Sequence, residues 1–525
     1  MTSLFFIPAF LLFLLPWLNP FAPGPSPPVM PWVIALMASG GLIGLGSLSS
    51  TAAAAPGQQP FARRWASPFA WALVLAGLAS SAIGLLQFFG MAGPLEPWVR
   101  QGTFGEAFAN LRQRNQFASL TNMALAALLW LAVHRRAALV SPGLSRLSHQ
   151  RELAVLLAAA LLAVGNAASS SRTGLMQLFV LCGLFWLWGG WRQRAAQRVL
   201  LVALVAYAAS TWLLPWLAGF DPFDRSMFAR LRDGDGVCES RRALWSNVIE
   251  LIALKPWLGW GWGELDYAHY ITLFEGVRFC AILDNAHNLP LHLAVELGVP
   301  VAVLVCGAIA WWAWRRQPWR EADPTRQLAW AVLAVIGLHS LLEYPLWYGP
   351  FQMVAVVCVG LLWHREQPSA GDEHELNPSR FKVLMLPLAI GLIASSFYVA
   401  WDYYRISQLY LAPQDRDAAY VDDAVGKARQ SRLFSRQVEF AELTTTPLNR
   451  SNAQSTFEIA SALLHYSPEP RIIEKVIESA VILGRDEEAM AHLARYRAAF
   501  PKEHAAWARG NARMPEIIEG LNQPK

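Results

Sequence analysis

The sequence predicts an all-α protein that crosses a membrane many times. Hydrophobic residues fill 54% of the 525 positions and charged residues only 15%, which lies outside the range of soluble globular domains. Apolar runs long enough to cross about 30 Å of hydrocarbon recur along the chain. The 24 Trp residues fit aromatic belts at the membrane–water boundaries. The net charge of +5 does not indicate a nucleic-acid partner, because Lys and Arg in such proteins first fix the topology.

Apolar runs predict about eleven transmembrane helices. They lie at about 3–19, 30–50, 68–90, 116–133, 153–168, 173–190, 199–218, 288–314, 327–342, 349–363 and 383–401. The first run has no basic residue before it and no small-residue cleavage site after it. We therefore expect a retained span rather than a signal peptide.

The distribution of positive charge predicts the orientation. Sixteen Lys and Arg fall in the loops 51–67, 134–152, 191–198, 315–326 and 364–382, whereas the short loops on the other side carry four. Because cytoplasmic loops hold the excess of positive charge, the N-terminus is predicted to be cytoplasmic. An odd number of spans then places the C-terminus on the opposite side.

Two polar regions are predicted on the non-cytoplasmic side, a loop at about 219–287 and a tail at 402–525. The sequence thus divides into a membrane domain, 1–401, and a tail domain. In the loop, Arg242–Leu254 has apolar residues at helical spacing and predicts a helix lying on the membrane surface. Lys255-Pro256 ends this helix.

The tail shows paired helical patterns. Apolar residues from Ile472 to Ala480 are followed by Gly484 and by a second helical pattern that ends at Phe500, before Pro501. This arrangement is similar to one unit of a tetratricopeptide repeat, and the alternative is an irregular helical domain. Either would provide a docking surface.

Cys238 and Cys280 share the polar loop, without the CxxC or His spacing of a zinc site. Two thiols in one loop of an oxidising compartment are expected to pair, and two free thiols are the alternative.

Unusual polar residues gather at the non-cytoplasmic ends of the predicted spans. Ionisable groups at membrane depth are costly, so such a cluster indicates a functional site. The set comprises Arg112, Arg114, Asn115, Gln116, Ser169, Ser170, Ser171, Arg172, Gln177, Arg241, Arg242, Asp284, Asn285, His287, Asn288, Glu343 and Tyr344.

Arginines on one side of the membrane predict an anion site. Arg114, Arg172 and Arg241 would offer guanidinium forks that match phosphate oxygens in bidentate geometry. Two alternatives stay open: Arg172 snorkels to the headgroups, or Arg241 anchors its helix to anionic lipid.

His287 is the predicted general base. Histidine is the residue type best suited to proton transfer at neutral pH, and His287 stands in the polar stretch Asp284–Asn288, directly before an apolar run. A structural role is the alternative. His292 and Glu296 continue the same predicted helix and are expected to serve packing or to support the residues that act.

Three further polar residues have open roles. Gln177 is expected either to support the site or to hydrogen-bond a neighbouring helix. Glu343 would balance the arginines, and Tyr344 would hydrogen-bond a substrate or join the aromatic belt. The stretch 256–264, PWLGWGWGE, predicts a turn held at the membrane interface, with sugar stacking as the alternative.

No nucleotide-binding loop, zinc-protease motif or acidic metal cluster occurs in the sequence. The site therefore needs an activated donor brought to it. A donor carried on a lipid pyrophosphate would supply the leaving group and explain several arginines.

These motifs, in this order, resemble the O-antigen ligase and polymerase superfamily, and within it the PglL-type bacterial protein O-oligosaccharyltransferases. The resemblance covers about 100–363. The matching stretches are Arg114–Ala118, Ser169–Gln177, Ser240–Trp245 with Pro256–Gly263, Asp284–Asn288 and Leu342–Trp347.

The resemblance implies a GT-C-like fold in a bacterial inner membrane, with the loop, the tail and the site facing the periplasm. It implies an undecaprenyl-pyrophosphate-linked glycan as donor, bound by the arginines, and a periplasmic, pilin-like acceptor protein activated by His287, without metal or nucleotide cofactor. Ser240 stands where the family commonly has Gly. Arg242 follows Arg241, so the identity of the phosphate ligand stays open, and the spacing to Trp245 favours Arg241.

Four other functions stay open at this point. A ligase acting on lipid A core and a glycan polymerase share the donor chemistry, and the long tail favours a protein acceptor over both. A transporter is expected to place charges near the midplane, whereas these gather at one face. A membrane scaffold would explain the tail but not the His and Arg residues.

Overall fold

The computed structural model describes residues 2–22, 24–49, 61–137, 145–223, 236–363 and 378–521. Within these ranges every regular element is a helix, which confirms the all-α prediction. Parts of three predicted cytoplasmic loops, 51–60, 138–144 and 364–377, lie outside the described residues, as does 224–235 of the predicted large loop.

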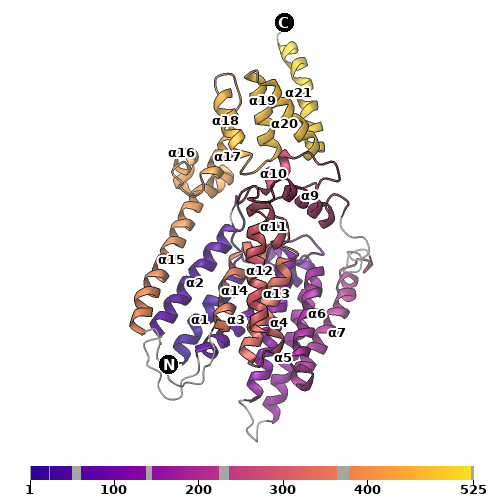
Figure 1. Cartoon of the computed structure of the whole chain (residues 1–525), viewed down its shortest axis with the longest axis vertical. Coiled ribbons are helices and arrows are strands. Elements are labelled where there is room, and N and C mark those ends of the chain that lie inside the picture. Colours follow the sequence, from indigo (N-terminus) through magenta and orange to yellow (C-terminus); the bar gives the residue numbers. More distant parts are fainter. Residues whose placement is uncertain are drawn as a thin grey trace. The chain divides into compact units, whose positions relative to one another are not determined.

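The chain forms two compact units (Figure 1). The membrane unit consists of 1–234 and 311–400, and the loop–tail unit of 235–310 and 401–525. The structure thus groups most of the predicted loop with the tail, whereas the sequence grouped it with the membrane helices. The functional division at 401 stays a prediction.

The helices of the membrane unit match the predicted spans. They are α1 (Thr2–Leu18), α2 (Val29–Ser49), α3 (Phe61–Phe88), α4 (Arg114–Ala137), α5 (Ser145–Ala168), α6 (Arg172–Leu187), α7 (Arg194–Leu217), α13 (Pro324–Ser340), α14 (Gly349–Trp363) and most of α15 (Pro378–Ser407). Six described helices are long and apolar enough to cross a membrane, and three shorter apolar helices accompany them. The multi-pass prediction is confirmed, and the count of eleven spans stays a prediction.

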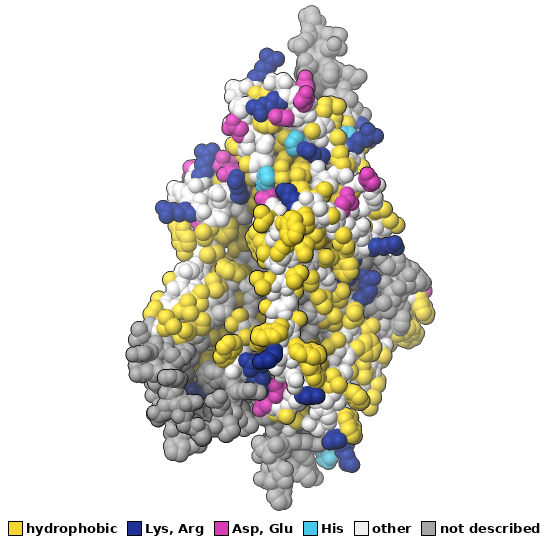
Figure 2. Space-filling view, viewed as in Figure 1, with side chains coloured by type: hydrophobic (Ala, Val, Ile, Leu, Met, Phe, Trp, Pro, Cys, Tyr) yellow, Lys and Arg dark blue, Asp and Glu magenta, His cyan; other side chains and the backbone are white. Residues whose placement is uncertain are grey.

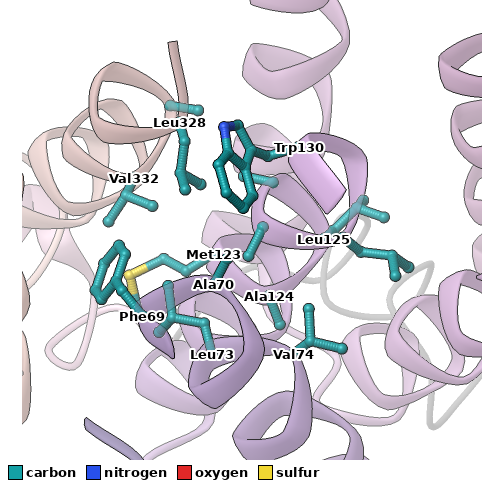
Figure 3. Close-up of a cluster of buried hydrophobic side chains, with 14 of the residues drawn as sticks. Phe69, Ala70, Leu73, Val74, Met123, Ala124, Leu125, Trp130, Leu328 and Val332 are labelled. Atoms are coloured by element: carbon teal, nitrogen blue, oxygen red, sulfur yellow. The ribbon is translucent and has the colours of Figure 1, made fainter. Parts of the chain in front are cut away.

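Helix α4 is the centre of the membrane unit, because 89% of its most apolar window is buried. Figure 3 shows Met123 and Trp130 of this helix among side chains of α3 and α13, including Phe69 and Val332. Burial from all sides explains why α4 lacks the amphipathic pattern of a surface helix. It also places the first turn of α4 next to other helix ends.

The loop–tail unit begins with two helices from the predicted loop, α9 (Arg241–Leu254) and α10 (Leu265–Ile271), and continues with α11 (Leu289–Leu297). The predicted helix at Arg242–Leu254 is confirmed as α9. The expectation that its apolar face lies on the membrane is wrong, because Leu244, Val248 and Leu251 are buried in a protein core with residues of α10 and α11.

The predicted span 288–314 is not one helix. It consists of α11 and α12 (Val299–Arg316), separated at Gly298, whose φ is +87°. A Cβ atom at Gly298 would lie 2.1 Å from the carbonyl oxygen of Trp257. The Trp-rich stretch therefore approaches the chain here so closely that only glycine fits, and the helix is broken.

The tail forms a run of short helices that pack in sequence. They are α16 (Ala424–Ala428), α17 (Ser435–Thr445), α18 (Ala453–Leu463), α19 (Pro470–Ile482), α20 (Asp486–Ala499) and α21 (Pro501–Leu521). The predicted helical pair is confirmed as α19 and α20, joined through Gly484 at φ +71°. Its likeness to a tetratricopeptide repeat stays a prediction.

The loop is fastened to the tail by α10. Tyr270 is part of the tail's hydrophobic core, and its hydroxyl lies 2.9 Å from His492 Nδ1 of α20. Tyr267 stacks on His465 at 3.7 Å between ring centroids, and His465 pairs with Glu264 at 2.6 Å. These contacts explain why loop and tail form one unit.

The predicted disulfide is confirmed. Cys238 and Cys280 are bonded, with their Cα atoms 5.3 Å apart. Asn247 of α9 holds the same segment, because its side chain donates to Val277 O at 3.1 Å and accepts from the Phe279 N–H at 2.8 Å. Both links tie the loop back to α9.

Candidate functional site

In the membrane unit, three distant motifs meet at one polar cluster. Asn115 lies in the first turn of α4, and its side-chain amide donates to Glu343 Oε1 at 3.0 Å. Ser171 precedes α6, and its hydroxyl donates to Asn115 Oδ1 at 2.5 Å. All three side chains are buried. The structure therefore joins predicted site residues that are up to 228 positions apart.

The Ser-Ser-Ser-Arg-Thr-Gly motif forms the tight turn that begins α6. Ser171 is the N-cap, and its Oγ accepts from the Gly174 N–H at 3.0 Å. A Cβ atom at Gly174 would lie 2.3 Å from Asn166 Oδ1, so only glycine fits. Ser170 adopts φ +49°. This local geometry places Arg172 at the first position of α6, half-buried.

Gln177 lies deeper in the same helix and is 0% exposed. Its amide donates to Ser119 Oγ at 2.7 Å and to Val335 O at 3.1 Å, and its oxygen accepts from Asn122 at 3.2 Å. Of the two expected roles, the structure shows the bond to neighbouring helices. Gln177 therefore joins α6 to α4 and α13.

Three members of this network were absent from the predicted set. Ser119, Asn122 and His339 are all buried, and His339 Nδ1 lies 2.8 Å from Ser119 Oγ. The available signal was a polar residue within an apolar run, which is costly in a membrane unless it is paired. His339 also accepts the Glu343 backbone N–H at 2.8 Å through its carbonyl oxygen. The network thus extends to the end of α13.

The remaining predicted residues of this unit have separate environments. Arg114 pairs with Glu106 at 3.0 Å, so a carboxylate already neutralises part of this predicted phosphate ligand. Gln116 is buried, and its backbone N–H donates to Gln113 Oε1 at 2.6 Å. Tyr344 is half-buried and stacks near Tyr348 at 6.1 Å between centroids.

In the loop–tail unit, His287 occupies a strained turn before α11. Its φ is +50°, a left-handed conformation that costs most residues energy, though His tolerates it better than bulky residues do. The His287 backbone N–H donates to Asn285 Oδ1 at 2.9 Å, and the next residue, Asn288, caps α11 by accepting from the Leu291 N–H at 3.0 Å. The polar neighbours of His287 therefore shape its backbone.

Arg241 and Arg242 are the first two residues of α9. Ser240 is their N-cap and accepts from the Ala243 N–H at 3.2 Å, which gives the residue at the family's glycine position a structural use. Arg241 is half-buried, and Arg242 is exposed. Trp245 Nε1 donates to Ala286 O at 3.1 Å, so α9 is joined to the turn that carries His287.

Asp266 in α10 is a buried carboxyl that was not predicted. Burial raises its pKa to about 7, and the charges of Asp284 and Glu264 add to the shift. No pattern in the sequence signals this burial. Perturbed carboxyls gather at functional sites, and Asp284 belongs to the His287 motif.

His269 and Arg278 form a second buried pair in this unit. The Arg278 guanidinium donates to the carbonyl oxygens of His269 at 2.6 Å and Thr272 at 2.9 Å. Burial lowers the pKa of His269 to about 3, and the Arg278 charge lowers it further. A permanently neutral imidazole fits a structural role, so His269 is a poor proton acceptor near neutral pH.

Among the described residues, no three or more His, Cys, Asp or Glu side chains are grouped so as to hold a metal ion.

Three family models match parts of the chain. The model described as "Protein glycosylation ligase" matches 107–132, "O-Antigen ligase" matches 157–306, and "Virulence factor membrane-bound polymerase, C-terminal" matches 327–514. The first two ranges contain every predicted motif except the one at 342–347, which lies in the third.

Two curated proteins of Acinetobacter baylyi are similar to the chain. One, named "General O-oligosaccharyltransferase", is 24% identical over 306 residues, which is 55% of this chain and 49% of that protein. The other, named "ComP-specific O-oligosaccharyltransferase", is 24% identical over 250 residues, which is 47% and 42% respectively. The alignment thus spans about half the length of these relatives or less. No solved structure matches the chain. Together, the ordered family matches and both relatives support the resemblance of the chain to the superfamily of O-antigen ligases and PglL-type protein glycosylation ligases.

Proposed function

We propose that the protein is an oligosaccharyltransferase of a bacterial inner membrane. It transfers a glycan en bloc from undecaprenyl pyrophosphate to Ser or Thr of a periplasmic, pilin-like protein. The observation that carries this proposal is that both curated relatives bear the name O-oligosaccharyltransferase and align over about half of the chain.

The proposed reaction balances without a redox partner. The acceptor hydroxyl oxygen attacks the anomeric carbon of the glycan, and the bond from that carbon to the pyrophosphate oxygen breaks. Undecaprenyl pyrophosphate leaves with the bonding electrons. His287 accepts the hydroxyl proton, and a left-handed backbone supported by Asn285 favours a fixed position for its ring.

The donor pyrophosphate is assigned to arginines. Arg172 and Arg241 are half-buried at helix starts, where backbone N–H groups and the helix dipole also favour an anion. Arg242 is the alternative to Arg241. Arg114 is the remaining candidate of the set, and it forms an ion pair with Glu106.

The other predicted residues are assigned supporting roles. Asn115 and Glu343 hold the helix ends around Arg172, and Gln177 holds them from below. The supporting set also contains Gln116, Asn288 and Tyr344. Of these, Tyr344 is assigned a hydrogen bond to the acceptor.

Periplasmic orientation is part of the proposal. The site, the loop and the tail would face the periplasm, with the N-terminus in the cytoplasm, because the basic loops lie on the other side of the predicted spans. No metal or nucleotide is assigned to the reaction.

A second candidate is an O-antigen ligase acting on lipid A core, or a glycan polymerase. It is favoured by the match of 157–306 to the O-antigen ligase model and of 327–514 to the polymerase model.

One experiment separates these functions. The chain is co-expressed with a lipid-linked glycan pathway and a candidate pilin. We expect a mass increase of one glycan unit on the pilin. A ladder on lipopolysaccharide with unmodified pilin would support the ligase, longer glycan chains on the lipid carrier would support the polymerase, and no transfer would contradict all three.

A further inference from the structure

The Trp-rich turn exposes large apolar side chains in the loop–tail unit. Trp257 is 75% exposed, Leu258 86% and Trp262 63%. Large apolar side chains exposed together in one short turn indicate an interaction site.

The backbone of this turn is fixed rather than loose. The Trp260 N–H donates to Val295 O at 2.9 Å, and the Val299 N–H donates to Pro256 O at 2.8 Å. A Cβ atom at Gly259 would lie 2.3 Å from Glu296 O, so the turn fits tightly against the α11–α12 junction. The exposed side chains therefore have a defined direction on a rigid support.

The apolar surface continues along α12. In residues 299–310 of α12, which belong to the same unit, Val303, Leu304 and Ile309 are all more than half exposed, and Ala302 is the one buried residue. Figure 2 shows hydrophobic side chains covering the region of α11 and α12. A helix that is apolar and exposed on most sides fits lipid contact.

The turn also has the composition of a membrane boundary. Trp is enriched at the headgroup level because its ring is apolar and its N–H is polar. Lys255 lies directly before the turn, with its ammonium 3.9 Å from the Trp260 ring centroid, and offers a cation to anionic headgroups. Charge and aromatic content thus favour a bilayer over a protein partner.

We propose that Trp257, Leu258 and Trp262 form a membrane anchor that inserts into the boundary between headgroups and acyl chains. The anchor acts on α9 directly, because Trp260 Nε1 donates to Leu251 O at 2.9 Å. Resting on the proposed function, its role is to hold Arg241 and the His287 turn at the depth of a lipid-linked pyrophosphate.

The test measures depth without requiring activity. In the full chain, Cys182, Cys306 and Cys358 are replaced by Ala, the disulfide is kept, and Leu258→Cys is labelled with an environment-sensitive fluorophore. The protein is placed in vesicles of phosphatidylethanolamine and phosphatidylglycerol, with or without lipids carrying a nitroxide near the headgroup. Val481→Cys, more than half exposed on α19 of the same unit, is the matched control.

We expect the label at 258 to emit at shorter wavelength than the label at 481 and to lose intensity with the nitroxide lipid. Equal, water-like emission at both positions would overturn the anchor. A shielded label at 258 that the nitroxide does not quench would also overturn it, because a second copy or another protein would then cover the turn.

The link to catalysis is tested separately with Trp257→Glu. A carboxylate at the headgroup–acyl boundary costs free energy, so we expect the quenching of the label to fall and glycan transfer to weaken, whereas Val481→Glu keeps both. Lost quenching with unchanged transfer would remove the positioning role. A quenched label in a chain without transferase activity would leave the anchor standing and contradict the proposed function alone.

Discussion

At the scale of single residues, the structure gives the predicted site residues different surroundings. The Gln177 side chain joins neighbouring helices and the Asn288 side chain caps α11, and His287 is half-exposed in a left-handed turn. Strain of this kind persists where surrounding contacts over-determine the backbone. His287 is therefore the residue for which a mutation most directly tests chemistry.

His287→Ala or His287→Gln is expected to abolish glycan transfer while lipid-linked donor is retained. General-base assistance is typically worth about 10²–10⁴ in rate, and donor binding is assigned to the arginines. Transfer and donor retention are measured on the purified variants. Near-normal turnover would remove His287 from the mechanism, and loss of donor would assign it to pyrophosphate binding.

Lysine substitutions test the arginines. Arg172→Lys and Arg241→Lys keep the charge but lose the guanidinium fork, so we expect weaker donor binding and at least about a tenfold loss of transfer. Arg242→Lys, at the exposed neighbour, is the matched control. Unchanged transfer in the first two variants would point to headgroup anchoring, and a loss confined to Arg242→Lys would exchange the roles.

Asp266 makes the stability of the loop–tail unit depend on pH. Burial raises the pKa of the Asp266 carboxyl to about 7. The protonated carboxyl therefore contributes fully to the stability of the fold below pH 3.8, and this contribution is lost as pH rises through about 7. Asp266→Asn keeps an acceptor for the Tyr267 N–H and avoids the buried charge. We expect a gain of about 1–3 kcal/mol near pH 8 that shrinks toward pH 5. Thermal unfolding of both variants is measured across this pH range, with Asp422→Asn at an exposed position as control. The same pH dependence in the two variants would contradict the assignment.

At the scale of elements, close backbone approach decides where helices begin and end. Gly174 lets α6 start against α4 and α5, and Gly298 divides α11 from α12. In both places a side chain would meet other atoms well inside contact distance. These glycines therefore set the start of α6, which carries Arg172, and the end of α11, the helix that follows His287.

Gly298→Ala is expected to detach the Trp-rich turn from the α11–α12 junction. The substitution combines a φ of +87° with a Cβ atom 2.1 Å from Trp257 O, so we expect a loss of about 1–3 kcal/mol or more. Gly307→Ala in α12 meets no atom within 4 Å and is the control. Thermal unfolding and protease cleavage of the turn are measured. Equal stability of the two variants would contradict the close approach.

At the scale of the whole molecule, each of the two compact units is built from two separate stretches of the chain. The loop is inserted between membrane helices in sequence, yet α10 packs into the tail core through Tyr270. On the face shown in Figure 2, charged side chains gather over the tail helices, and hydrophobic ones cover the long helices. This contrast fits tail helices in water and long apolar helices in lipid.

The topology is tested with reporter fusions. A reporter active only outside the cytoplasm is expected to be active after Gln430 and silent within 364–382, because the basic loops are assigned to the cytoplasm. The opposite pattern would overturn the predicted orientation, and equal activity at both positions would contradict the number of spans between them.

The sequence alone determined the helical class, the apolar runs, the cysteine pair and the polar motifs. These features are local: a run of apolar residues or a cap such as Ser171 acts within one or two turns of chain. The periodicity of α9 likewise predicted that one face of the helix is buried. It could not predict whether lipid or protein covers that face, since both accept the same Leu and Val side chains.

The tertiary structure decided which residues contact one another. Asn115 meets Glu343 across 228 positions, and His339 joins Ser119 across 220, pairings that no local pattern encodes. The same holds for Asp266, whose pKa is set by burial under other elements. Hydrogen bonds and desolvation depend on which surfaces meet, so the identity of each contact emerges only when the helices pack.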